Sequence, residues 1–189
     1  IFAALAALLL AAGAPGQASA MSEKAQIKLG REQHQKVLAE MGAYDDDAVQ
    51  AYVTELGHKL ALKSDWPKLE WTFTVVDTDD VNAFALPGGH VVLHSGLLLA
   101  ADRAEEIAGV LAHEIAHVTG RHSLRNIIGS AGLYLALSAV AGDASGLLAV
   151  LADNSAFLLD RKFTRDFERE ADHVGWDYLV RAGLDPAGM

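Results

Sequence analysis

Residues 113–117 read His-Glu-Ile-Ala-His, and this HExxH string is the strongest chemical feature of the chain. On an α-helix, positions four apart project from one face, so His113 and His117 can offer two imidazole nitrogens to one tetrahedral zinc ion. Glu114 lies about 100° around the helix from His113. Its carboxylate would therefore stand beside the metal without binding it, where it can take a proton from a zinc-bound water.

The residues around the motif favour the helix that this geometry requires. Apolar residues recur at three- and four-residue intervals from Ile107 to Val118, which predicts a helix with one face toward the core. Asp102 followed by Glu105 resembles a capping box and predicts where the helix begins. A five-residue motif also arises by chance in roughly one chain in a hundred. The alternative to a zinc site is therefore a pair of exposed histidines on a helix without a metal, and a third ligand is needed to decide between them.

The third ligand is expected in the string Phe-Glu-Arg-Glu-Ala-Asp at 167–172, because a catalytic zinc ion usually has three protein ligands and one open position. The string belongs to a second helical pattern that ends near Gly183. Glu168 and Asp172 share one face, whereas Glu170 lies about 200° from Glu168, so the two glutamates cannot both face one metal. We predict Glu168 as the ligand and Asp172 as the acceptor of a ligand histidine's other N–H. Glu170 fits a solvated charged surface.

With these two strings, the chain resembles a family of zinc metallopeptidases that includes CAAX prenyl proteases, HtpX-like proteases and the periplasmic BepA- and LoiP-like proteases. The resemblance rests on HEIAH at 113–117 and on Glu-x-x-Ala-Asp at 168–172. It extends to NAFALPGGHVVLHSGLL at 82–98 and to residues 29–61. It implies a zinc metalloendopeptidase with one zinc ion per chain, and it implies that the first Glu of the second string, Glu168, is the third ligand.

The resemblance implies further features around the metal. Asn82 would lie by the catalytic water and help to polarise a substrate carbonyl, with a turn residue as the equal alternative. A sheet edge near the zinc would pair with extended substrate backbone, which makes cleavage tolerant of side-chain sequence. Relatives also carry a His-Pro segment after the second helix, and the sequence stops at Met189 before any such residue. We therefore expect the metallopeptidase domain, residues 21–189, to be incomplete at its C-terminus.

The remaining patterns predict an α+β fold, a mainly helical zincin-like domain with a small β-sheet beside the HExxH helix. Two helices are expected over 22–42 and 46–63, with a cluster of aspartates to cap the second. Residues 71–76 alternate and are rich in β-formers, which predicts a strand. A strand pair is expected from 82–86 and 90–94, joined by Pro-Gly-Gly. The sheet is antiparallel or mixed, and the HExxH helix follows it directly.

The first twenty residues form a separate segment. An uncharged apolar run leads to Ala18-Ser19-Ala20, which fits a signal-peptidase site. Because no initiating Met and no positively charged start precede it, we interpret residues 1–20 as a partial secretory signal peptide. This predicts a periplasmic or otherwise secreted protein. A retained membrane anchor at the N-terminus is the alternative.

Composition limits the partners. The net charge of −10 argues against nucleic acid or an anionic membrane as the main partner. The absence of cysteine excludes a disulfide framework, a thiol nucleophile and a lipidated cysteine. Asp143 divides the apolar stretch 127–151 into runs too short to span a bilayer, which favours core or lid helices. A hairpin that contacts substrate or rests on a membrane is the alternative, so membrane proximity stays open.

The other histidines lack a partner at a recognised ligand interval. His90 and His94 share a strand face and His122 follows the HExxH helix closely, so we expect surface or supporting positions for all three. His34, His58 and His173 lack even such closeness in sequence to the HExxH helix.

The residues of the HExxH string together with Glu168 predict metal-assisted hydrolysis of peptide bonds. The secretory signal and the family resemblance imply that the substrates are unfolded or misassembled envelope proteins, and the resemblance implies that they bind in extended form. A zinc-stabilised chaperone or binding module is the alternative from another class. It is disfavoured because Glu114 would then have no structural duty, and because a structural zinc more often has four protein ligands. A membrane-embedded prenyl-protein protease is disfavoured by the lack of convincing spans. Specific substrates and the oligomeric state do not follow from the sequence.

Overall fold

The computed structural model of the chain describes residues 22–125 and 165–189, and residues 22–123 with 165–189 form one compact unit. The expected signal peptide at 1–20 and the apolar stretch 127–151 lie outside the described residues. Within the two described ranges, none of the helices combines the length and the apolar character that a membrane crossing needs.

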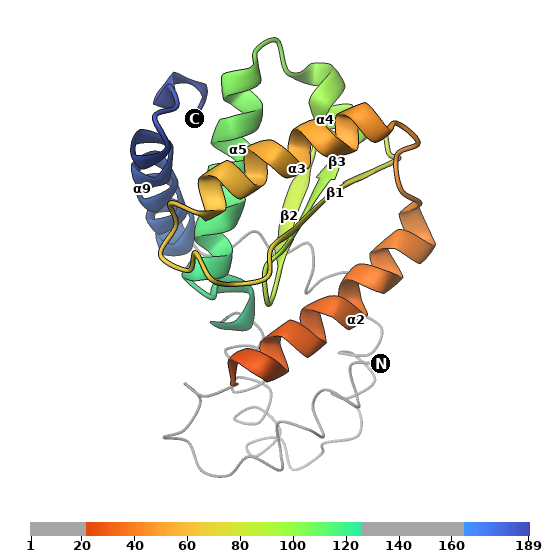
Figure 1. Cartoon of the computed structure of the whole chain (residues 1–189), viewed down its shortest axis with the longest axis horizontal. Helices are drawn as coiled ribbons and strands as arrows, with labels where there is room; N and C mark the ends of the chain where they lie inside the picture. Colours follow the sequence, from red (N-terminus) through yellow and green to blue (C-terminus); the bar gives the residue numbers. More distant parts are fainter. Residues whose placement is uncertain (1–21, 126–164) are drawn as a thin grey trace, which may run out of the picture. The chain divides into compact units, whose positions relative to one another are not determined.

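A three-stranded mixed sheet lies at the centre of this unit (Figure 1). Its strands are β1 (Thr72–Val76), β2 (Ala83–Leu86) and β3 (His90–His94), in the order β1-β3-β2. β1 runs parallel to β3, whereas β2 and β3 form the antiparallel pair that the sequence predicted. β2 is therefore an edge strand of the sheet.

Two N-terminal helices confirm the sequence prediction to within two residues. They are α2 (Glu23–Met41) and α3 (Asp47–Ala61). The side chain of Asp46 caps α3, because its Oδ1 accepts the backbone N–H groups of Ala48 and Val49 at 2.9 and 3.1 Å.

Further helices and a short 3-10 turn follow the sheet, and residues 122–125, directly after the HExxH helix, are also helical. The short helix α4 (Ser95–Ala100) lies between β3 and the HExxH helix, so the predicted direct connection is wrong. α5 (Ala104–Thr119) carries HExxH and α9 (Arg165–Ala182) carries the second string. The 3-10 turn η1 (Pro186–Gly188) follows α9.

The predicted capping box at the start of α5 is also wrong. The helix begins one residue later, with Arg103 at the N-cap and without a side-chain cap, because arginine has no acceptor oxygen. The side chain that reaches back is that of Glu106, whose Oε2 accepts the backbone N–H of Asp102 at 3.0 Å. The reciprocal bond from a glutamate to the backbone N–H of Asp102 is therefore present, but Glu106 makes it in place of the predicted Glu105.

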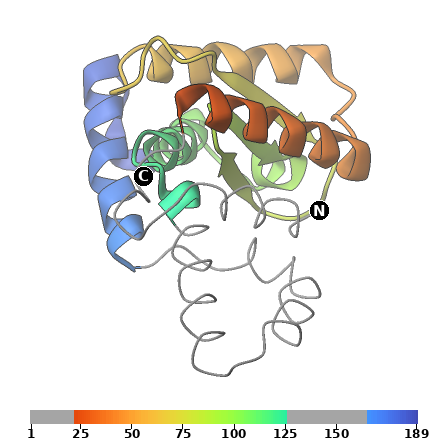
Figure 2. The same cartoon turned by 90° about the horizontal axis from the view of Figure 1, so that it is seen from below.

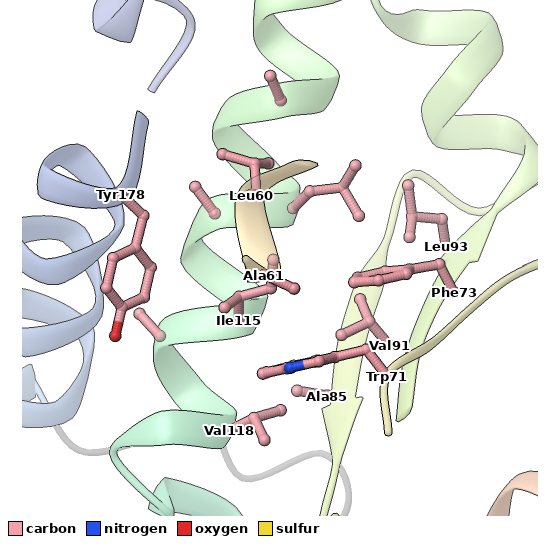
Figure 3. Packing of buried hydrophobic residues seen from close by; sticks show 14 of the residues in the cluster. Leu60, Ala61, Trp71, Phe73, Ala85, Val91, Leu93, Ile115, Val118 and Tyr178 are labelled. Atoms are coloured by element: carbon pink, nitrogen blue, oxygen red, sulfur yellow. The ribbon is translucent and has the colours of Figure 1, made fainter. Parts of the chain in front are cut away.

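Alternate residues of the strands face two different layers, as the period of a strand requires. Phe73, Val91 and Leu93 belong to the main core, which they share with residues of α3, α5 and α9 (Figure 3). Val76, Leu86 and Val92 point the other way and pack against partly buried side chains of α2. Figure 2 shows α2 across this second face of the sheet.

α5 lies between the sheet and α9, which places the two motif helices side by side (Figures 1 and 2). The absence of a side chain at Gly175 permits this approach. A Cβ atom there would stand 3.1 Å from the backbone of Ala112 and of His113. The Tyr178 side chain, fully buried on α9, packs in the same core as Ile115 of α5. The fold therefore presents the second string directly to the HExxH motif.

Candidate metal centre

His113, His117 and Glu168 form the one group of three or more metal-binding side chains that the described residues bring together, and one ligand atom from each lies within 4.8 Å of the others. The Nε2 atoms of the two histidines are 2.9 Å apart. The carboxylate oxygens of Glu168 lie 3.5 Å from Nε2 of His113 and 3.7 Å from Nε2 of His117. In tetrahedral coordination at about 2.1 Å, donor atoms are separated by about 3.4 Å. The three side chains need to move by only about half an ångström to hold a cation.

The protonation of the ring nitrogens also fits a cation. Nδ1 of His113 lies 3.0 Å from Oδ1 of Asp172, and a carboxylate can only accept a hydrogen bond. Nδ1 of His113 is therefore the protonated nitrogen, and its Nε2 presents a lone pair toward Nε2 of His117. Two facing lone pairs repel each other unless a proton or a metal ion lies between them. Nε2 of His113 thus offers a lone pair that can accept a proton from Nε2 of His117 or bind a cation.

The His117 side chain is neutral at physiological pH. Burial, followed by the charges of His113 and His122, lowers the pKa of His117 to about 3. Only the neutral imidazole has a lone pair for a metal, so this environment keeps His117 ready to bind.

Glu114 lies beside this group without belonging to it, as predicted. The residue is buried, with 8% of its surface exposed, and its Oε2 has no hydrogen-bond partner in the described structure. Burial raises the pKa of Glu114 to about 8, and the charge of Glu168 adds to the effect, while a backbone hydrogen bond from Ala85 acts in the opposite direction. The hydrogen bond from Ala85 links this carboxyl group to the edge strand β2.

Asp172 occupies the position that the helix geometry predicted. It lies one turn after Glu168 on α9, so one carboxylate faces the ring nitrogens and the other faces Nδ1 of His113. Its side chain remains 65% exposed. Solvent therefore screens the interaction with His113.

Asn82 forms no hydrogen bond to His113, His117 or Glu168 in the described part of the chain. It is exposed at the start of β2, and its backbone carbonyl accepts the N–H of His94 at 3.0 Å. Its amide side chain makes no hydrogen bond to another described residue. The structure thus shows a strand-start residue at the sheet edge, and a role in the reaction stays a prediction.

His122 and Glu170 belong to the surroundings of the metal group, and sequence reasoning gave neither of them a specific role there. His122 is fully buried, and its Nδ1 lies 2.8 Å from Nδ1 of His117. Glu170, which fitted a solvated surface, lies with Oε2 3.4 Å from Nε2 of His122. The interval of five residues from His117 to His122 was the available signal, but it matches no regular helical spacing.

His90 and His94 are buried, so a surface position for them is wrong. They lie on the face of β3 opposite the main core, where His34 of α2 stacks on His90 with ring centroids 5.0 Å apart. The prediction that His90 and His94 share one face of a strand is confirmed, but that face points away from α5.

Comparison with known proteins gives consistent matches. The family model described as peptidase family M48 matches residues 47–189. A putative beta-barrel assembly-enhancing protease of Vibrio cholerae is 37% identical over 155 residues, which cover 77% of this chain and 32% of that protein. The beta-barrel assembly-enhancing protease of Escherichia coli is 34% identical, with the same two coverages of 77% and 32%. The mitochondrial metalloendopeptidase OMA1 of Schizosaccharomyces pombe is 34% identical over 71% of this chain and 40% of its own length. The chain thus spans about a third of the length of the first of these relatives.

Proposed function

Because the chain belongs to peptidase family M48, we propose that it forms the catalytic part of a zinc-dependent endopeptidase that cleaves unfolded or misassembled cell-envelope proteins. The observation that carries the proposal is the convergence of His113, His117 and Glu168 beside the buried Glu114. Members of this family are metal-dependent, and the group supplies two neutral nitrogens and one carboxylate. That donor set suits one zinc ion per chain and leaves a coordination position open.

Glu114 is the general base of the proposed reaction. His113, His117 and Glu168 would hold the zinc ion, which would supply Lewis-acid polarisation of the substrate carbonyl and of the attacking water. Glu114 accepts the proton of the attacking water and then returns it to the leaving amine. The backbone N–H of Ala85 holds the carboxyl group in place during both transfers.

The raised pKa of Glu114 makes its basic form depend on the metal. With a pKa of about 8, the carboxyl group is largely protonated at neutral pH when no cation is near. A positive charge beside it favours the carboxylate and lowers that pKa. Glu114 therefore becomes a base when the metal site is filled, which couples catalysis to metal binding.

The edge strand β2 is the proposed docking position for extended substrates. In the antiparallel pair of β2 and β3, Asn82 and every second residue after it form the hydrogen-bonded pairs with β3. Ala83 and Ala85 occupy the non-hydrogen-bonded positions between them. Their own N–H and C=O groups therefore point away from the sheet. Ala85 already donates to Glu114, and its carbonyl accepts the hydroxyl of Ser123 at 3.1 Å. Ala83 is thus the open position, and the proposal assigns the contact with the polarised carbonyl to its neighbour Asn82.

The envelope location rests on two observations. The apolar start that ends at Ala20 fits a secretory signal, which gives a periplasmic or otherwise secreted protein, or an N-terminal anchor if it is retained. Two relatives are named for the assembly of β-barrels. The negative net charge supports polypeptide rather than nucleic acid as the substrate.

The test of the enzymatic proposal is Glu114→Gln in the full-length, zinc-loaded protein. Glutamine keeps the size of the side chain and loses its basicity, so cleavage of an unfolded substrate such as casein should slow by about 10²- to 10⁴-fold. Zinc content and circular dichroism should stay unchanged. Glu105→Gln, on the same helix and away from the ligands, is the matched control and should keep full activity.

Two results would reject parts of this proposal. If Glu114→Gln cleaves within a few-fold of the wild type, Glu114 is not the base. If neither protein cleaves any unfolded substrate and both suppress aggregation equally, the chain is a zinc-stabilised binding module.

A separate variant tests the edge strand. Ala83→Pro removes one outward N–H without removing a hydrogen bond of the sheet, because proline is tolerated at such edge positions. The loss of one hydrogen bond of about 1 kcal/mol should raise KM about fivefold with little change in kcat. Ala83→Gly, which keeps the N–H, is the control. An unchanged KM for Ala83→Pro would place the substrate elsewhere.

A further inference from the structure

We propose that His122, supported by Glu170, is a positioning residue that fixes the ring of His117 for metal binding. The inference rests on the metal site proposed above and adds two residues to it. It starts from the contact of 2.8 Å between the Nδ1 atoms of His117 and His122.

The chain leaves α5 in a way that brings His122 back onto the site. Arg121 has a φ of 55°, in the left-handed region, so the path of the α5 backbone is broken directly before His122. The ring of His122 then passes close to Gly120, where a Cβ atom would stand 2.4 Å from its Nε2. On its other side the ring stacks on Phe167 of α9, with centroids 4.5 Å apart and planes 8° from parallel. The ring is held from two sides before it meets His117.

The hydrogen-bond directions are consistent along the whole series of side chains. Nε2 of His117 faces the other ligands, so its Nδ1 carries the proton and donates to Nδ1 of His122. His122 accepts at Nδ1 and, as a neutral ring, carries its proton on Nε2. Nε2 of His122 lies 3.4 Å from Oε2 of Glu170, a contact of ion-pair length. The donor of His117 therefore has an acceptor in His122, and no group needs to be charged except the outermost carboxylate.

The two ligand histidines are thus supported differently. His113 donates directly to Asp172, which is 65% exposed. His117 is buried, with 1% of its side chain exposed, and a carboxylate placed directly behind it would be a buried charge close to Glu114 and Glu168. A neutral imidazole accepts the same proton at lower cost and extends the contact to the half-exposed Glu170. His122 therefore fixes the tautomer and orientation of His117 without adding charge to the interior.

The experiment measures zinc affinity of the full-length protein by competition with a chromophoric chelator. His122→Phe keeps a ring to stack on Phe167 and removes the acceptor, and the loss of such an outer partner should weaken zinc binding about 10- to 100-fold. His122→Asn places an oxygen where Nδ1 lies and should bind within a few-fold of the wild type. Glu170→Ala should weaken binding by only a few-fold, because its contact is long and half-exposed. Arg169→Ala, an exposed neighbour on α9, is the control and should bind normally.

A second measurement needs no variant. Nitrogen-15 NMR of the zinc-bound wild type should show His122 protonated at Nε2 and unprotonated at Nδ1. Protonation of His122 at Nδ1 would overturn the proposal, as would wild-type affinity in His122→Phe. If His117→Ala also keeps wild-type affinity, the proposed metal site itself is wrong rather than its support.

Discussion

Pairs of histidines with the same four-residue interval occur in two regions of the chain, His113 and His117 on α5 and His90 and His94 on β3. On the helix, residues four apart lie about 6 Å from each other, and the two Nε2 atoms meet at 2.9 Å. On the strand, the same interval spans about 13 Å. The interval alone therefore predicts no metal site, because the secondary structure decides whether the two rings can meet.

The two regions also differ in what surrounds the rings. Carboxylates of α9 approach His113 and His117, whereas the ring nitrogens of His90 and His94 have no hydrogen-bond partner among the described residues. Burial lowers the pKa of His90 to about 4, much as it lowers the pKa of His117. A buried histidine whose pKa is lowered is thus common to both regions, and the metal site differs in that its two rings meet beside the carboxylate of Glu168.

The largest effect that separates the two regions should come from removing a ring. His113→Ala or His117→Ala removes a proposed ligand. Zinc affinity should fall by more than about 100-fold, which is the largest loss typical for residues that only hydrogen-bond to a ligand. His90→Phe, in the other region, should leave zinc content unchanged. Metal analysis after dialysis checks both. Loss of zinc from a folded His90→Phe protein would show that the two regions are coupled.

Lowering the pH should destabilise the protein through the region around His90 and His94. His90 binds a proton near pH 4 in the folded state and near pH 6.5 when unfolded, because burial first, and then His34 and Arg31, disfavour its charged form. The free energy of unfolding should therefore fall as pH drops from about 6.5 to about 4, and His90 accounts for about 3 kcal/mol of that fall.

Replacement of His90 tests this assignment. Zinc-free His90→Phe should lose correspondingly less stability than zinc-free wild type between pH 7 and pH 4 in urea unfolding. His58→Gln, at an exposed position, is the control. Parallel acid profiles for the wild type and His90→Phe would contradict the assignment.

An intermediate effect is expected at Asp172. Asp172→Ala removes the acceptor for Nδ1–H of His113, and zinc affinity should fall by about tenfold, the lower end for such partners because solvent screens this contact. Asp166→Ala, exposed on the same helix, should bind zinc like the wild type. An unchanged affinity in Asp172→Ala would leave His113 without a supporting carboxylate.

The smallest effect should come from the contact between α2 and the sheet. Nε2 of His34 lies 2.9 Å from Oγ1 of Thr74, and Thr74→Val removes this hydrogen bond with little change of shape. The free energy of unfolding should fall by about 1 kcal/mol. Zinc affinity should not change, because Thr74 faces α2 and not α5. A change in zinc affinity of Thr74→Val would show that the contact between α2 and the sheet is energetically coupled to the metal site.

Most of the secondary structure near the site was predictable because its signals are local. The strand at 71–76, the pair at 82–94 and the helices α2 and α3 appear within two residues of their predicted bounds. The start of α5 was misplaced because Asp102 and Glu105 have the right types in the wrong register. The short helix α4 was missed because six residues carry too little periodicity.

The sequence by itself determined which side chains of each helix share a face. Helical spacing alone placed His113 with His117, and Glu168 with Asp172, because 3.6 residues per turn is a property of the backbone. The tertiary structure decided what those faces meet. The approach of α9 at Gly175 brought Glu168, Glu170 and Asp172 to α5, and the left-handed backbone at Arg121 preceded the placement of His122 beside His117. These contacts depend on packing between distant segments and on one left-handed residue, and neither leaves a periodic pattern along the chain.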